Sequence, residues 1–184
     1  MQIIKTDFPN LLVIEPRVFK DDRGYFYESY NHREFSDNGI NNLFIQDNQA
    51  KSSYGVIRGL HYQLAPYAQS KLLRVVEGAI LDVVVDLRKG SPTYGRYFSI
   101  ELTSDNFLQI FVPKGFAHGY SVLSETCIVQ YKCDDYYNPQ FEAGVNIFDP
   151  KLNIDWKVPT DKAIISNKDK VWPMFDLAIH DFRL

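Results

Sequence analysis

The sequence has no long hydrophobic run and no excess of charge of either sign. Its longest apolar stretches, at residues 79–85 and 107–113, are interrupted by Asp82 and Gln109, and both fall well short of the roughly 20 residues that a membrane helix needs. The chain has 23 acidic and 20 basic residues. It lacks the runs of Lys or Arg that are typical of nucleic-acid and membrane-surface binders. We therefore predict neither a nucleic-acid partner nor a membrane partner.

Cysteine is also scarce, and its placement limits the redox chemistry. Cys127 and Cys133, the only two cysteines, lie in one predicted strand, about 20 Å apart at roughly 3.3 Å per residue, so they cannot bridge each other. The first residues lack the charged segment, apolar run and cleavage site of a secretion signal. These features predict reduced thiols and a cytoplasmic location.

Histidine, the commonest metal ligand, occurs only four times. A catalytic zinc or iron site needs about three converging protein ligands, and jelly-roll metalloenzymes usually begin theirs with a His-x-His pair. Here His61 is followed by Tyr62 and Gln63, so we predict no metal centre. His32 and His180, in a short predicted helix and in the C-terminal tail, are expected to be surface histidines.

Short apolar or alternating segments, each closed by turn residues, make up most of the chain. No helix of crossover length separates them, so they predict an all-β sandwich or jelly roll, and a length of 184 residues suits a single domain. One short helix is expected over Asn31–Asn38, with Asn31 as its cap, and prolines after residue 150 predict a tail of loops and short helices. The predicted strands are residues 11–15, 25–30, 43–49, 71–76, 80–87, 97–102, 108–112 and 126–133.

Ten motifs, spread over nearly the whole chain, occur in an order that resembles the signatures of the dTDP-4-dehydrorhamnose 3,5-epimerases. That family has a cupin-like jelly roll, a double-stranded β-helix, so the resemblance implies one domain over residues 1–184 with short peripheral helices. It also implies that the 150–184 tail folds over the barrel. The motifs are Asp22–Glu28, Gln46–Asn48, Arg58–Gln63, Lys71–Arg74, Asp82–Arg88, Ser91–Gly95, Pro113–Gly119, Tyr131 with Tyr136 and Tyr137, Glu142–Gly144 and Ser166–Asp169.

The implied reaction is epimerisation of dTDP-4-dehydro-6-deoxy-D-glucose at C3 and C5, which gives dTDP-4-dehydro-L-rhamnose for surface polysaccharide synthesis. The C4 ketone acidifies the protons on C3 and C5, so a base can remove each one and an acid can return it from the opposite ring face. The enolate oxygen needs a cation or a hydrogen-bond donor. We therefore expect an isomerase that uses no cofactor.

The resemblance assigns the catalytic roles to four residues. His61 is the expected base, because an ordinary imidazole pKa of roughly 6.5 leaves it largely neutral in the cytoplasm. Asp169 would orient the His61 ring and stabilise its charged form. Lys71 would stabilise the enolate, and Tyr131 would be the proton donor on the far face. Without the surrounding motifs, a single His on a strand would more often be structural, Lys71 could be a solvated lysine at a strand end, and Tyr131 could simply pack in the barrel.

A second set of residues is expected to bind the nucleotide diphosphate and the sugar. Strand parity places Tyr137, rather than Tyr136, on the face of Tyr131 as a platform for the thymine base, although either tyrosine could simply pack in the barrel. Parity also places Arg58 and His61 on opposite faces, so Gly59 must interrupt the pleat for both to reach one pocket. The expected binding residues are Arg23, Glu28, Gln46, Asn48, Arg58, Lys71, His118, Tyr137, Glu142 and Lys168.

Four points stay open. His118 suits a ligand contact and a hydrogen-bonded core position equally well, and residues 145–148 lack a Trp that we expected nearby. In the family the first strands, with Arg23 and Glu28, cross to a partner subunit, which implies a homodimer. Other functions compatible with the scaffold are a single-site epimerase or ketoisomerase on a related dTDP-deoxysugar, a metal-dependent jelly-roll enzyme and a non-catalytic sugar- or nucleotide-binding module.

Overall fold

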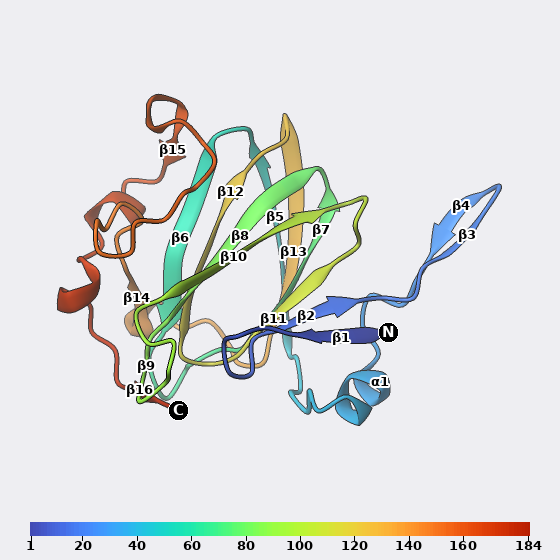
Figure 1. The fold of residues 1–184 in the computed structure, drawn as a ribbon, viewed down its shortest axis with the longest axis horizontal. Coiled ribbons are helices and arrows are strands. Elements are labelled where there is room, and N and C mark those ends of the chain that lie inside the picture. The colour runs from blue at the N-terminus through green and yellow to red at the C-terminus, as the bar shows by residue number, and fades with distance from the viewer.

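The apolar segments of the sequence form two antiparallel sheets that face each other (Figure 1), in a computed structural model that describes residues 1–184. Strands follow one another in the first sheet in the order β1-β2-β11-β7-β13-β5 and in the second in the order β10-β8-β12-β6-β14. The first sheet consists of β1 (Gln2–Lys5), β2 (Leu12–Glu15), β11 (Gln109–Val112), β7 (Lys71–Glu77), β13 (Thr126–Cys133) and β5 (Gln46–Ser53). The second consists of β10 (Tyr97–Thr103), β8 (Ala79–Asp86), β12 (Phe116–Val122), β6 (Val56–Gln63) and β14 (Glu142–Gly144).

The remaining elements are short. β15 (Ile164–Ile165) pairs in parallel with β6, β16 (Phe182–Arg183) pairs with β9 (Arg88–Lys89), and β3 (Phe19–Asp21) forms a hairpin with β4 (Gly24–Phe26). The only α-helix is α1 (His32–Asp37), and single 3₁₀ turns occur at Pro139–Phe141, Thr160–Lys162, Asp169–Val171 and Phe175–Leu177. None of the helices is long and apolar enough to cross a membrane.

The second sheet is covered on both faces, and this explains its nearly continuous apolar strands. On β8, Ile80 and Val84 face the first sheet in the central core, whereas Leu81 and Val83 belong to a second core beneath the C-terminal tail. Phe175 of the tail is buried in that second core. The tail therefore packs over the barrel, and the all-β jelly-roll class is confirmed.

Most sequence-predicted elements are confirmed, but their bounds differ where the chain leaves the pleat. The strand at 126–133 is correct, and α1 begins at an Asn31 cap whose side chain accepts a hydrogen bond from the Glu34 N–H at 3.4 Å. The strand predicted at 25–30 ends at Phe26, and the one predicted at 43–49 begins only at Gln46. These two bounds were wrong because the apolar residues at 27–30 and 43–45 lie in irregular backbone outside the strands.

Strand β1 and the two central strands β6 and β12 were missing from the predicted set. Gly59 on β6 and Gly119 on β12 lie back to back, and a Cβ on Gly59 would come within 2.6 Å of the Gly119 Cα. These glycines interrupt the apolar alternation that reveals other strands. The expectation that His180 lies at the surface was also wrong, since it is 9% exposed and packs against Tyr94 and Phe175.

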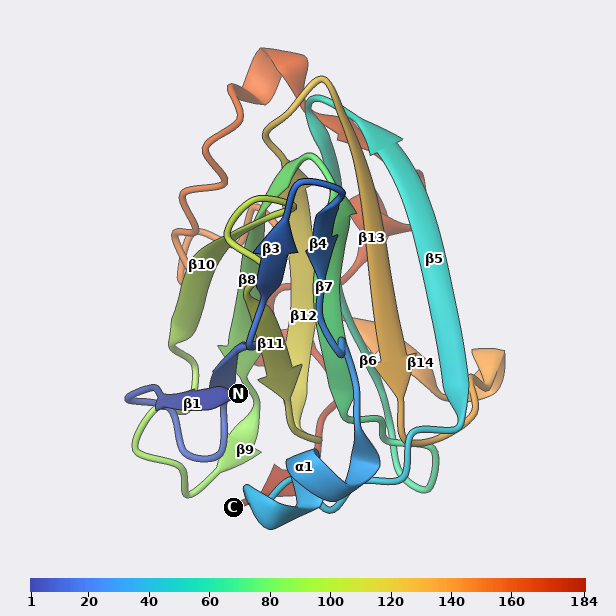
Figure 2. The ribbon, with the colours of Figure 1, turned by 90° about the vertical axis from the view of Figure 1, so that its right-hand side faces the viewer.

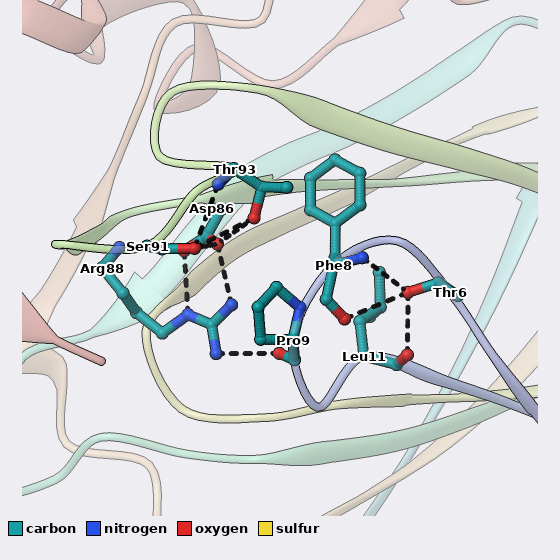
Figure 3. Close-up of polar contacts among 8 residues, drawn as sticks. All are labelled: Thr6, Phe8, Pro9, Leu11, Asp86, Arg88, Ser91 and Thr93. Atoms are coloured by element: carbon teal, nitrogen blue, oxygen red, sulfur yellow. Dashed lines mark hydrogen bonds and ion pairs between the residues drawn. The ribbon is translucent and has the colours of Figure 1, made fainter.

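A buried ion pair fastens the loop between β1 and β2 to the barrel (Figure 3). The Arg88 guanidinium donates to both carboxylate oxygens of Asp86, at 2.8 and 2.7 Å, and also to the carbonyl of Pro9 at 2.9 Å. Ser91 and Thr93 each donate a hydroxyl to Asp86 at 2.6 Å. Burial alone would raise the pKa of Asp86, but these hydrogen bonds outweigh it and hold the pKa below its usual value.

Candidate functional site

The cavity lies between the two sheets, at the side where β5 of the first sheet faces β6 and β14 of the second. It has two adjoining lobes of about 610 and 600 Å³, and four residues line both of them. We call the lobe that contains Tyr137 and Glu142 the β14 lobe, and the lobe that contains Ile164 and Ile165 the β15 lobe. The four shared residues are His61, Lys71, Tyr131 and Lys168.

An irregularity in β6 brings two of the expected residues to the same lobe. His61 pairs with His118 and Arg58 pairs with Tyr120, so three steps along β6 match two steps along β12. Such a bulge shifts the alternation of side chains by one position. Gly59, within the bulge, has a φ of 135°, a region that favours glycine. The expected break in the pleat is present, and Arg58 and His61 both line the β15 lobe.

His61 and Asp169 form a close pair although 108 positions separate them in the chain. The His61 Nε2 lies 2.6 Å from the Asp169 Oδ1, and the Asp169 side chain is only 4% exposed. Because an ionised carboxylate only accepts hydrogen bonds, the His61 Nε2 is the donor. Burial would raise the pKa of Asp169, but its bond to His61 outweighs this and lowers it. The pair is therefore an imidazole ring oriented by an ionised carboxylate.

Lys71 and Tyr131 stand on the opposite wall, on adjacent strands of the first sheet. The Lys71 Nζ lies 5.9 Å from the centre of the Tyr131 ring and makes no hydrogen bond or ion pair with the protein. Burial lowers the pKa of Lys71, and burial raises the pKa of Tyr131 to about 12. At neutral pH the phenol keeps its proton, and the Lys71 amine has no acidic side chain in contact with it.

The wall of the β14 lobe is a network of polar side chains. Glu142 accepts from the Lys168 ammonium at 2.7 Å and from the Tyr137 hydroxyl at 2.8 Å. Gln46 accepts from the Tyr137 backbone N–H at 3.0 Å and donates to Asn48 at 3.1 Å. Tyr137 is half exposed at this wall, whereas the neighbouring Tyr136 does not line the cavity. The structure thus brings these five predicted residues together.

His118 fits both alternatives that the sequence left open, a ligand contact and a hydrogen-bonded core position. It lines the β15 lobe, and its Nε2 donates to the Asp82 Oδ2 at 2.7 Å. Asp82 is fully buried and lies on β8, the strand next to β12. Sequence reasoning missed Asp82 because an acidic residue within an apolar strand signals a buried partner without identifying it.

Arg23 and Glu28 do not reach the cavity of their own chain. Arg23 lies at the turn of the β3–β4 hairpin, which projects away from the barrel (Figure 1). Its side chain is 90% exposed and pairs only with Asp21, at 2.5 Å. Glu28 accepts from the Asn31 side chain at 3.2 Å, beside α1. Figure 2 shows the hairpin in front of the first sheet. Within one chain, these two predicted binding residues remain apart from the other eight.

Trp172 is a site neighbour that sequence reasoning missed. Its ring meets the His61 ring edge to face, with centroids 6.3 Å apart, and packs against Gly144. The Asn146 side chain donates to the Trp172 carbonyl at 3.2 Å, so the tail supplies the tryptophan that residues 145–148 lack. No three His, Cys, Asp or Glu side chains converge as potential metal ligands.

Comparisons with known proteins agree on one family. Residues 5–176 match the family model described as dTDP-4-dehydrorhamnose 3,5-epimerase. The enzyme of that name from Methanothermobacter thermautotrophicus is 46% identical over 172 residues, which cover 93% of this chain and 92% of the relative. A crystal structure of the Elizabethkingia anophelis enzyme superposes with a TM-score of 0.91 at 50% identity, covering 96% of this chain and 97% of the other. The Legionella pneumophila enzyme, solved with dTDP-4-keto-L-rhamnose, gives a TM-score of 0.92 at 42% identity, covering 96% and 93%.

Proposed function

Because the chain belongs to the dTDP-4-dehydrorhamnose 3,5-epimerase family, we propose that it epimerises C3 and C5 of dTDP-4-dehydro-6-deoxy-D-glucose to give dTDP-4-dehydro-L-rhamnose. One observation carries the proposal beyond family membership. His61, on the second sheet, and Tyr131, on the first, face the same cavity from opposite walls. Inversion at a carbon needs a base on one face of the sugar and an acid on the other.

The proposed steps use only groups that line the cavity. His61, held by Asp169, removes the proton from C3 or C5, and the electron pair of the broken C–H bond forms an enolate on the C4 oxygen. Lys71 stabilises that oxygen as charge develops on it. Tyr131 returns a proton to the carbon from the opposite face, so that the configuration inverts. These steps occur once at each carbon, with no change in oxidation state. Between the two, His61 gives its proton to water and Tyr131 regains one from water.

The binding roles follow from charge and shape. In the proposal, Tyr137 supports the thymine base while Gln46 and Glu142 contact the nucleoside. Arg58 and Lys168 attract the diphosphate, because guanidinium and ammonium groups form charge-assisted bonds to phosphate oxygens. Asn48 and His118 complete the set around the sugar. The cytoplasmic location also stays part of the proposal.

We also propose a homodimer in which Arg23 and Glu28 serve the site of the partner subunit. Both residues lie on or beside the hairpin that projects from the barrel, and Arg23 has only Asp21 as a partner. The hairpin exposes Phe19, Tyr25 and Phe26, at 50%, 58% and 66%. An arm with exposed aromatic rings and unpaired strand edges is stabilised when a second chain covers it.

Isotope exchange tests the proposed reaction. With the thymidine-linked keto sugar in D₂O, we expect NMR to show deuterium at both C3 and C5 together with the 3,5-inverted product. Label at one carbon only would indicate a single-site epimerase, and tight binding without label would indicate a binding module. Activity that disappears after chelation and returns with a metal ion would indicate a metal-dependent enzyme. Each of these three results contradicts the proposal.

A further inference from the structure

Gln63 is a buried amide at the cavity to which the proposed function gives no role. It is 5% exposed, ends β6 and lines the β14 lobe but not the β15 lobe. Regular pairing with β14 puts it on the same face as His61, two positions before it. Its partner across that pairing is Glu142, whose side chain reaches Tyr137 within the lobe. The Gln63 side chain therefore faces the β14 lobe.

One hydrogen bond fixes the orientation of this amide. The Gln63 Oε1 accepts the backbone N–H of Asn138 at 2.9 Å, directly after Tyr137 in the chain. The oxygen thus holds the Tyr137 segment against β6, and the Nε2, with its two N–H donors, makes no hydrogen bond to the protein. The Nε2 is not among the side-chain atoms that are sealed from solvent without a partner, so it keeps surface that a ligand can reach.

The other amide nitrogens at the β14 lobe are already engaged. Gln46 donates its Nε2 to Asn48 at 3.1 Å, and Gln69 donates its Nε2 to the carbonyl of Asp135 at 2.7 Å. The Asn48 Nδ2 lies 3.7 Å from the Cys133 sulfur and donates to it. The amide at the end of β6 is therefore the one whose donors are free for a ligand.

That amide lies in the part of the cavity proposed for the base. Arg58 lines the β15 lobe and Lys168 lines both lobes, whereas Gln63 lines only the lobe of Tyr137. A base stacked on Tyr137 with its phosphates toward Lys168 has its C4 edge farthest from the phosphates, because C4 lies across the ring from the glycosidic bond. In thymine this edge carries a carbonyl oxygen, which accepts from an amide N–H. In cytosine it carries an amino group, which would oppose one donor to another.

We infer that the Gln63 Nε2 donates a hydrogen bond to the C4 carbonyl oxygen of the thymine base and so selects thymine over cytosine. This inference rests on the proposed function, because it takes a thymidine diphosphate sugar as the ligand. The amide then has two contacts, with its oxygen on the Tyr137 segment and its nitrogen on the base that Tyr137 supports. Gln63 is thereby a determinant of nucleotide specificity and has no contact with the hexose.

Two nucleotides that differ at the C4 edge test the contact. 5-Methyl-2′-deoxycytidine diphosphate keeps the methyl group and the sugar of thymidine diphosphate but has an amino group in place of the C4 carbonyl. By titration calorimetry, we expect the wild type to prefer thymidine diphosphate by about tenfold. In Gln63→Met, which keeps the length of the side chain, that preference should shrink by roughly three- to tenfold. Gln140→Met, on an exposed glutamine that lines neither lobe, is the matched control and should keep the wild-type preference.

Two results would overturn the inference. One is an unchanged preference in Gln63→Met, even with weaker binding of both nucleotides, which would show that the amide acts only by holding the Tyr137 segment. The other is a wild-type protein that binds both nucleotides equally, a result that does not depend on whether the variant folds. Failure of the proposed function looks different, because the wild type would then show no exchange at C3 and C5 of the keto sugar.

Discussion

Asp169 lies 2.6 Å from His61 although 108 positions separate the two residues in the chain. His61 belongs to a central strand, whereas Asp169 begins a 3₁₀ turn in the tail. Parallel pairing of β15 with β6 brings the tail back alongside the strand of the histidine. The Gly59 backbone N–H also donates to Asp169, at 3.5 Å, so the bulge and the carboxylate share a contact. The tail thus supplies the carboxylate that orients the proposed base.

Asp169→Asn should disable the base while preserving the shape of the site. The amide cannot stabilise the charged imidazole that forms when His61 takes a proton, so we expect kcat to fall by about 10²- to 10⁴-fold. KM should change little, because Asp169 is not proposed to contact the ligand. Asp176→Asn is the control, since Asp176 is exposed and pairs only with Lys151. An Asp169→Asn enzyme with normal kcat would contradict the assigned role.

Tyr131→Phe should separate exchange from inversion. His61 can still remove protons and return them to the face from which they came, so deuterium should continue to enter the substrate. Without the phenol on the opposite wall, we expect formation of the inverted product to fall by about 10²-fold or more. NMR in D₂O measures both rates in one sample. Equal loss of label and of inversion would show that Tyr131 is needed for proton removal itself.

Lys71→Met should increase stability and decrease activity. Burial lowers the pKa of Lys71 from its ordinary value of 10.5, so the folded state disfavours the ammonium at neutral pH. That penalty is present below the lowered pKa and disappears as pH rises to the ordinary value, so the stability advantage of Lys71→Met should shrink at high pH. Loss of the cation that stabilises the enolate should reduce kcat by about 10²- to 10³-fold. Thermal melts between pH 7 and 10, with parallel rate measurements, check both effects.

Asp86→Ala should destabilise the fold without altering the chemistry. It leaves the buried Arg88 guanidinium without its counter-ion, and breaking such a pair costs about 3 to 5 kcal/mol. None of the residues in this network lines the cavity, so kcat at a temperature where the variant is folded should equal the wild-type value. Denaturant unfolding of both proteins measures the difference in their free energies of unfolding. Asp105→Ala, at an exposed position, is the control.

The ion pair of Asp86 and Arg88 also predicts how the stability of the fold depends on pH. Asp86 has a lowered pKa in the folded state, so it stabilises the protein above its ordinary pKa of 3.8, and this contribution is lost as pH falls through the lowered value. The free-energy difference between wild type and Asp86→Ala should therefore be constant near neutrality and shrink in acid. A difference that persisted unchanged well below pH 3.8 would show that the Asp86 carboxylate is not the stabilising species.

Mixed dimers test whether Arg23 serves the partner subunit. Arg23→Ala and His61→Ala should each be inactive or nearly so as homodimers. After unfolding and refolding together, half of the dimers are mixed and each mixed dimer has one intact site, so we expect about a quarter of wild-type activity. If Arg23 acted in its own subunit, or had no role, mixing would restore nothing beyond the activity of the separate variants.

Local patterns in the sequence were sufficient for the fold class and for the family. Alternation and turn residues predicted the strand at Thr126–Cys133, and the order of the motifs identified the family that the comparisons confirm. Strand parity favoured Tyr137 over Tyr136, and Tyr137, which lies beyond the end of β13, lines the cavity. These inferences succeed because the side-chain period of a strand and the chemistry of a motif are properties of consecutive residues.

Tertiary structure alone decided which of these residues meet. The bulge at Gly59 turns Arg58 toward the lobe that His61 lines, the paired tail places Asp169 on His61, and the projecting hairpin carries Arg23 away. Distances between remote segments depend on strand order, register and packing, which arise from contacts between residues far apart in sequence. Consecutive residues specify each surface, and only the packed sheets determine which surfaces face each other.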